Sequence, residues 1–167
     1  MYALVVYESL WGNTEQLARA IADGIGGERA KVVDAASAPG ALSPEVKLLV
    51  VGGPTHAFSM STASTRDAAR QQGAKHIPAR GIREWIKAHA SPGRAVLVAT
   101  FDSRVVSPRL PGSAAKKAMK RLVALGFQPI ARPETFGVHG NSGPVAAGEL
   151  ERARRWGAEL ASFLSQP

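Results

Sequence analysis

Cysteine is absent from the 167-residue sequence. This excludes disulfides, thiolate catalysis, iron–sulfur ligation and zinc–thiolate sites. Histidine is scarce, and the four present show no metal-ligand spacing, so we expect no metal site: His56, His76, His89 and His139. No apolar run approaches the ~18–20 residues of a membrane span, and no basic leader precedes the first strand pattern. We therefore expect a cytoplasmic protein that does not enter a membrane.

Acidic residues are missing from one long segment. The net charge is +8, and between Asp102 and Glu134 there are seven bases and no acids: Arg104, Arg109, Lys116, Lys117, Lys120, Arg121 and Arg132. One interpretation is a solvated helix face. The other is a docking field for an acidic partner or a phosphorylated ligand. Aromatic residues are not interleaved with these bases, which disfavours nucleic acid as the partner.

Apolar strand patterns and amphipathic helix patterns alternate along the chain. Strands are expected at 3–7, 30–35, 46–53, 94–100 and 127–131, and helices after residue 14 and at 65–72, 82–89, 113–125 and 146–164. This alternation predicts a single α/β domain over residues 1–167, with helices on both faces of a five-stranded parallel sheet of order 2-1-3-4-5. The loops 8–14, 54–61 and 101–112 then meet outside the carboxyl ends of the strands, and 133–148 is expected to be irregular.

The first strand, turn and helix have the geometry of a phosphate site. A helix N-terminus presents free N–H groups and a favourable dipole to an anion, and Ser9 and Thr14 add hydroxyl groups. Gly12 lets the backbone approach a ligand closely. The loop lacks the lysine of a Walker A loop and the three spaced glycines of a dinucleotide fingerprint. The alternative is a strand–helix turn, capped by Asn13 or Thr14, that binds no ligand.

This stretch resembles the signature of the flavodoxin family. Two apolar residues, an aromatic, a hydroxyl residue, a glycine, a threonine and an alanine follow at the family's spacing: Val5, Val6, Tyr7, Ser9, Gly12, Thr14 and Ala18. The resemblance implies a flavodoxin-like three-layer sandwich that binds FMN. It also implies that the first loop holds the FMN phosphate, through Ser9, Leu10, Trp11, Gly12, Asn13 and Thr14.

The second loop follows two glycines at the end of a buried strand pattern. Gly52 and Gly53 would leave room for a flat ring near the backbone. The resemblance implies that this loop contacts the flavin through Pro54, Thr55, His56, Ala57 and Phe58. Phe58 would lie against the ring. The alternatives are a solvent-facing His56 and a Phe58 packed in the core.

The third loop follows the strand expected at 94–100. The resemblance implies that it closes on the ring through Thr100, Phe101, Asp102, Ser103 and Arg104. Phe101 is the nearest aromatic to the ring, with a position in the core as the alternative. Arg104 and Arg109 would favour the anionic reduced flavin and so raise its reduction potential.

The leading functional hypothesis is an FMN-binding electron-transfer protein without catalytic residues of its own. FMN carries the electrons, and the partner is a redox protein with an acidic surface. The first alternative is an FMN-dependent NAD(P)H:quinone-type reductase, for which the bases would attract a pyridine nucleotide. A second alternative, of another class, is a non-redox binding module that uses the basic stretch 104–132.

Overall fold

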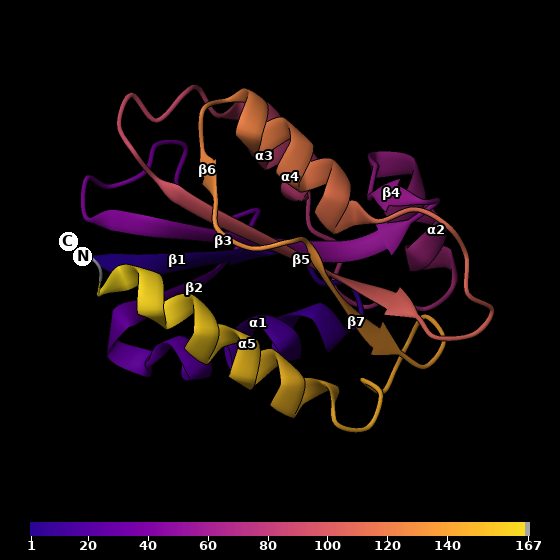
Figure 1. Ribbon diagram of the computed structural model, residues 1–167. Coiled ribbons are helices and arrows are strands. Elements are labelled where there is room, and N and C mark those ends of the chain that lie inside the picture. Colours follow the sequence, from indigo (N-terminus) through magenta and orange to yellow (C-terminus); the bar gives the residue numbers. More distant parts are fainter. Residues whose placement is uncertain (166–167) are drawn as a thin grey trace.

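The computed structural model describes residues 1–165 (Figure 1). Its strands are β1 (Tyr2–Tyr7), β2 (Ala30–Asp34), β3 (Val46–His56), β4 (Ser59–Met60), β5 (Leu97–Val105), β6 (Gln128–Pro129) and β7 (Glu134–Val138). Its helices are α1 (Asn13–Ile25), the short 3₁₀ helix η1 (Gly27–Arg29), α2 (Ala63–Gln71), α3 (Ile82–Ala88), α4 (Ala114–Ala124) and α5 (Glu149–Leu164). None of the helices within residues 1–165 is both long and apolar enough to cross a membrane.

The strands form a parallel sheet of order β2-β1-β3-β5-β6, and this confirms the predicted flavodoxin-like α/β fold and strand order. The fifth strand position is divided into two pieces, because both β6 and β7 pair with β5 in parallel. The prediction of one strand at 127–131 and an irregular 133–148 was therefore wrong in detail. Pro129 and Pro133 have no N–H to donate to the ladder, which favours a break between them.

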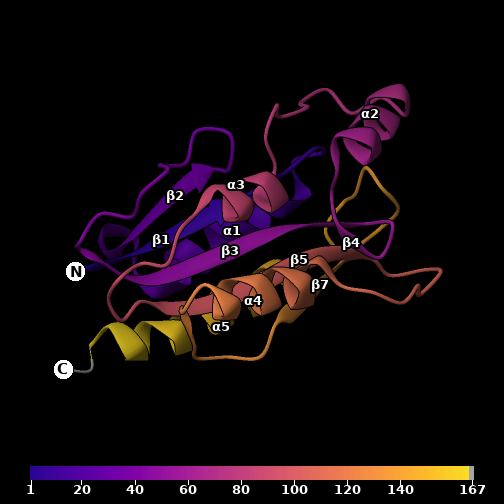
Figure 2. The ribbon, with the colours of Figure 1, turned by 90° about the horizontal axis from the view of Figure 1, so that it is seen from above.

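Two helical layers cover the sheet (Figures 1 and 2). Helices α1 and α5 lie on one face, and α3 and α4 lie on the other. Alternate residues of each strand point to opposite faces, so Val5 belongs to the buried cluster that includes Leu17 of α1, whereas Val6 belongs to the one that includes Trp85 of α3. Burial on both faces explains why the central strands are almost continuously apolar.

Two strands extend beyond their predicted ends. β3 continues to His56 and turns back as β4, whose two residues pair antiparallel with Thr55 and His56. β5 continues to Val105 because its second half pairs with β7. The expected loops 54–61 and 101–112 are therefore partly strand. The pairing partners are distant or follow a tight turn, so the local apolar pattern did not reveal them.

Candidate functional site

An open cleft of about 280 Å³ lies at the carboxyl ends of β1, β3 and β5. These strand ends are on the right-hand side of Figure 1, where β4 and α2 stand beyond the sheet. The structure brings together parts of all three loops that the sequence singled out. The predicted site residues that line the cleft are Ser9, Leu10, Trp11, Asn13, Thr14, Pro54, Thr55, His56, Ala57, Ser103 and Arg104.

The first loop leaves the start of α1 without a side-chain cap. Gly12 is the N-cap residue, with φ of 90°, and within residues 1–165 no side-chain capping hydrogen bond forms there. Ser9 Oγ instead accepts from the Gly12 N–H, at 3.1 Å. Thr62 caps α2 and Ser113 caps α4, whereas α5, like α1, starts at a glycine without a side-chain cap, Gly148. The first-turn N–H groups of α1 therefore remain available to an anion in the cleft.

The hydroxyl of Thr14 is buried beside this helix start. Its Oγ1 lies 2.8 Å from Oγ of Ser103, and the two share a buried hydrogen bond. Asn13 is also buried, and its side-chain amide fills the space that a Cβ at Gly143 would need. The first loop is thus fixed from two sides, by β5 and by the segment that precedes α5.

The second loop is a tight hairpin between β3 and β4. Its two turn residues, Ala57 and Phe58, have φ of 45° and 68°. This left-handed backbone suits a two-residue hairpin, although it favours asparagine and glycine. Phe58 is 52% exposed and lies beside a smaller hollow of about 130 Å³ that adjoins the cleft. It does not pack in the core.

His56 lines the cleft on the same hairpin, and its Nδ1 lies 3.3 Å from Oγ1 of Thr65. Burial lowers the pKa of His56, and the nearby positive charge of Arg66 lowers it further. The imidazole is therefore neutral at neutral pH. It contributes hydrogen-bonding capacity to the cleft and no charge.

Phe101 lies in the core. It is fully buried and packs edge-to-face against Phe136 and Trp156. Its ring occupies the space that a Cβ at Gly52 would need, and Ile82 does the same at Gly53. The expectation that these glycines leave room for a flat ring is therefore corrected, because core side chains fill that room.

Thr100 and Asp102 are also fully buried and do not line the cleft. Oγ1 of Thr100 donates to the Ala115 carbonyl at 2.9 Å. Oδ2 of Asp102 accepts from Thr55 Oγ1 at 3.1 Å, and also from Ser113 Oγ and the Ala115 N–H. These two residues join β5 to the start of α4. The Thr55 hydroxyl donates its only proton to Asp102 and accepts from the Ala114 N–H, so it has no proton left for a ligand in the cleft.

Several cleft residues gave no signal in the sequence. Helix α2 forms one wall, and the turn after β7 forms the neighbouring rim; these contribute Thr65, Ala68, Ala69, Gln72, Val138, Gly140 and Asn141. The rim closes where Asn141 Nδ2 donates to Gln72 Oε1 at 2.9 Å. Leu110 also lines the cleft, and its carbonyl accepts from the Arg104 guanidinium.

A buried carboxylate, Glu8, anchors this wall to the first loop. Glu8 accepts from the hydroxyl of Ser61 and, at 2.9 Å, from the Ile82 N–H. Ser61 in turn accepts from buried Arg66 of α2, which pairs with Glu84 at 2.7 Å. Burial raises the pKa of Glu8, although these hydrogen bonds oppose the rise. The sequence gave no indication of this network, because its members are far apart along the chain.

Comparisons with known proteins agree with this geometry. The family model described as flavodoxin matches residues 5–156. A flavodoxin from the domain Archaea is 19% identical, with a TM-score of 0.67 over 99% of this chain and 100% of that one. Oxidised Flavodoxin 1 from Bacillus cereus is 17% identical, with a TM-score of 0.68 over 100% of this chain and 99% of that one.

A WrbA-like flavodoxin from Agrobacterium tumefaciens is 19% identical, with a TM-score of 0.60 over 96% of this chain and 95% of that one. The comparison with curated proteins gave no match. At these identities the similar structures establish the fold, and the family model establishes the family.

Proposed function

The chain belongs to the flavodoxin family, and on that basis we propose that it is an FMN-binding electron-transfer protein. Family membership suggests FMN and a redox partner protein, and it makes a cytoplasmic location the natural expectation. The observation that carries the proposal is the uncapped start of α1 on the floor of the cleft, with Ser9 and Thr14 beside it. This position suits an anionic group. No helix-capping side chain takes up the first-turn N–H groups, and no lysine side chain of the loop fills the space beside them.

The phosphate end of FMN would lie on the loop from Ser9 to Thr14. First-turn N–H groups, the hydroxyls of Ser9 and Thr14 and the amide of Asn13 are the donors within reach of this position. Charge-assisted hydrogen bonds are worth roughly 1.5–3 kcal/mol each. A few of them can therefore hold a phosphate without a cation in the loop.

The ring end would lie toward the hairpin and the segment Ser103–Arg104. Phe58 offers an exposed aromatic face, and His56 offers a neutral imidazole. Arg104 adds a positive charge at the cleft wall. Bound FMN would supply the electron chemistry. The protein would position the ring and limit its contact with water, with no side chain acting as acid or base.

An FMN-dependent NAD(P)H:quinone-type reductase is the second candidate. The hollow beside Phe58, lined also by Arg104, Pro108, Leu110 and Pro111, offers an apolar surface next to a cation. Such a surface suits a flat substrate ring. Measuring NAD(P)H oxidation with a quinone acceptor separates the candidates. Turnover no faster than that of free FMN supports the electron carrier, and much faster turnover supports the reductase.

The direct test of the proposal is FMN retention. The purified protein is mixed with FMN and passed through a desalting column, and the flavin absorption that stays with the protein is measured. We expect retention in about one-to-one ratio, because the cleft forms one site. A protein that emerges colourless after this treatment would overturn the proposal.

A further inference from the structure

Two of the exposed large apolar side chains lie together beside the cleft mouth. Phe58 and Leu110 are 52% and 55% exposed, and both line the same hollow. Val106, in the same loop as Leu110, does not line this hollow, and its side chain occupies the space that a Cβ at Gly137 would need. This loop, 106–112, projects beyond the sheet in both views (Figures 1 and 2). We name Phe58 and Leu110 the apolar centre. A group of exposed apolar side chains of this kind is typical of an interaction site.

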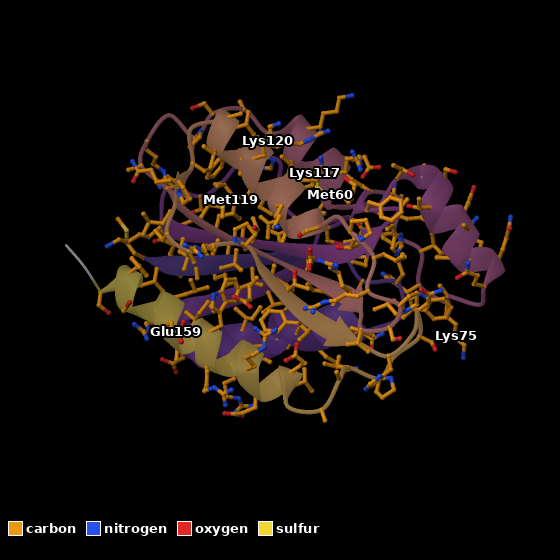
Figure 3. The ribbon with its side chains drawn as sticks, turned by 45° about the vertical axis from the view of Figure 1, so that its right-hand side comes forward. Met60, Lys75, Lys117, Met119, Lys120 and Glu159 are labelled. Atoms are coloured by element: carbon orange, nitrogen blue, oxygen red, sulfur yellow. The ribbon has the colours of Figure 1, made fainter. Side chains whose placement is uncertain are left out.

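Cations lie next to the apolar centre on two elements. Arg104 and Arg109 precede Leu110 along the chain, and α4 begins directly after the loop. Figure 3 shows Lys117 and Lys120 on the outer side of α4, while Met119 points toward the sheet. We name the exposed and half-exposed bases the basic rim: Arg104, Arg109, Lys116, Lys117, Lys120 and Arg121. No ion pair joins any of them to an acid within residues 1–165.

The charge of the protein is concentrated here. Residues 103–133 carry seven of the 21 bases and none of the 13 acids, so the rest of the chain is almost balanced. The neighbouring helix α3 does not neutralise the rim. Its Lys87 is exposed, and its one acid, Glu84, is paired with Arg66.

The spacing of the bases on α4 is unfavourable for an isolated helix. Lys116 lies four residues before Lys120, and Lys117 lies four residues before Arg121. Like charges at this spacing repel one another and destabilise a helix. An acidic surface placed against α4 would relieve this repulsion.

We propose that the apolar centre and the basic rim form the docking surface for an electron-carrier protein with an acidic surface. The inference rests on the proposed function, because it places the partner beside the cleft mouth. Apolar side chains in the middle with charges around them match the usual arrangement of a protein–protein interface. Complementary charge would steer the partner and orient it. A nucleic acid would match the cations, but its backbone would leave the apolar centre without a partner.

The experiment measures binding of an acidic [2Fe–2S] ferredoxin to the full chain with added FMN, by calorimetry at low and at high ionic strength. Basic cytochrome c and duplex DNA are the comparison probes. The variant Lys117→Glu/Lys120→Glu is compared with Arg154→Glu/Arg155→Glu, which makes the same charge change at exposed positions of α5, on the opposite face. Leu110→Gln tests the apolar centre. The FMN content of each protein is measured separately.

We expect ferredoxin to bind more tightly than cytochrome c. At low ionic strength the α4 variant should weaken ferredoxin binding about tenfold, and the α5 variant should weaken it less than about twofold. The difference between the two variants should shrink at high salt. Leu110→Gln should weaken binding about equally at both salt concentrations.

Equal effects of the two charge variants would overturn the proposal. So would tighter binding of cytochrome c, or of DNA with the same dependence on Lys117 and Lys120. FMN retention without ferredoxin binding would contradict the docking surface alone. Ferredoxin binding without FMN retention would support the docking surface while the proposed function fails.

Discussion

The hydroxyl oxygens of Thr14 and Ser103 lie 2.8 Å apart, and their hydrogen bond joins the first turn of α1 to β5. The two hydroxyls have two protons between them, and the shared bond uses one. The other proton can be donated to a ligand. Two loops far apart in the sequence therefore present one donor at the floor of the cleft.

Thr14→Val tests this donor. Valine keeps the shape of threonine but has no hydroxyl, so FMN binding should weaken by roughly 1.5–3 kcal/mol if the phosphate accepts a charge-assisted hydrogen bond there. Titration of the apoprotein with FMN, followed by flavin fluorescence, measures the change. An unchanged affinity would remove Thr14 from the proposed phosphate site.

A control is needed because Thr14→Val also loses a buried hydrogen bond. Gly157 of α5 packs against the backbone of Ile21 in α1, and a Cβ there would overlap with the Ile21 carbonyl. Gly157→Ala should therefore destabilise the protein by about 1–3 kcal/mol while leaving the cleft intact. Under conditions where both variants are folded, only Thr14→Val should weaken FMN binding.

Phe58→Gly should change stability and FMN binding in opposite directions. The left-handed backbone of Phe58 costs about 1–2 kcal/mol for a residue with a side chain, and glycine removes this cost but adds about 0.5–1 kcal/mol of chain entropy. The variant should thus be more stable by up to about 1.5 kcal/mol in urea unfolding. It should bind FMN more weakly because the exposed aromatic face is lost. A loss of stability would show that Phe58 has a structural role instead.

The sequence was sufficient to predict the fold and the family, because both depend on local patterns. Residues 5–18 contain a strand, a turn and a helix start whose spacing is readable without knowledge of the rest of the chain. The order of the strands then followed from the alternation of elements and from the handedness of their connections. The alternative of a Phe58 packed in the core was wrong, because its side chain is 52% exposed.

The rest depended on contacts between distant residues. Gly52 was interpreted as room for a ligand ring, but the ring of Phe101 fills that space. Composition alone could not show whether a ligand ring or a core side chain fills the space at Gly52. Helix α2 became a wall of the cleft through Arg66 and Glu84, which hold it beside Glu8. Buried polar networks of this kind satisfy their hydrogen bonds across several elements.

Glu8 should make the protein less stable as pH rises. Its pKa in the folded protein is raised above the ordinary value of 4.5, so between these two values the folded state keeps a proton that the unfolded chain has released. Stability therefore falls as pH rises through this window. Glu8→Gln keeps an acceptor oxygen but does not titrate, and it should flatten this part of the profile.

Urea unfolding of both proteins at several pH values measures this effect. Glu84 and Glu149 have lowered pKa values: burial opposes the Arg66 pairing at Glu84, and Arg152 is the main cause at Glu149. Their contribution to folding stability is lost as pH falls through their lowered pKa values. Both lowered values lie below 4.5, so these two groups do not titrate in the window compared. Parallel profiles for the two proteins above pH 4.5 would contradict the assignment to Glu8.

Asp102 provides the last test. Its buried position predicts that substitutions there change stability, whereas a direct contact with the flavin ring would predict that they change FMN affinity. Its Oδ2 accepts from Thr55, Ser113 and the Ala115 N–H, so Asp102→Ala should destabilise the protein by about 3 kcal/mol or more through unpaired buried donors. Asp102→Asn should cost only about 1 kcal/mol, mainly from the lost charge at the start of α4. The amide nitrogen can take the place of Oδ1, which has no partner within residues 1–165.

FMN affinity then distinguishes the two roles of Asp102. Its carboxylate does not line the cleft, and the Asn variant keeps an oxygen that can hold Thr55 and the start of α4 in place. We therefore expect Asp102→Asn to bind FMN within about twofold of the original protein, a difference well below 1.4 kcal/mol. A carboxylate that accepted from the flavin ring directly would lose about 1.5–3 kcal/mol of binding on this change. A loss of that size in a folded Asp102→Asn protein would place Asp102 at the ring and require the cleft to open toward it when FMN binds.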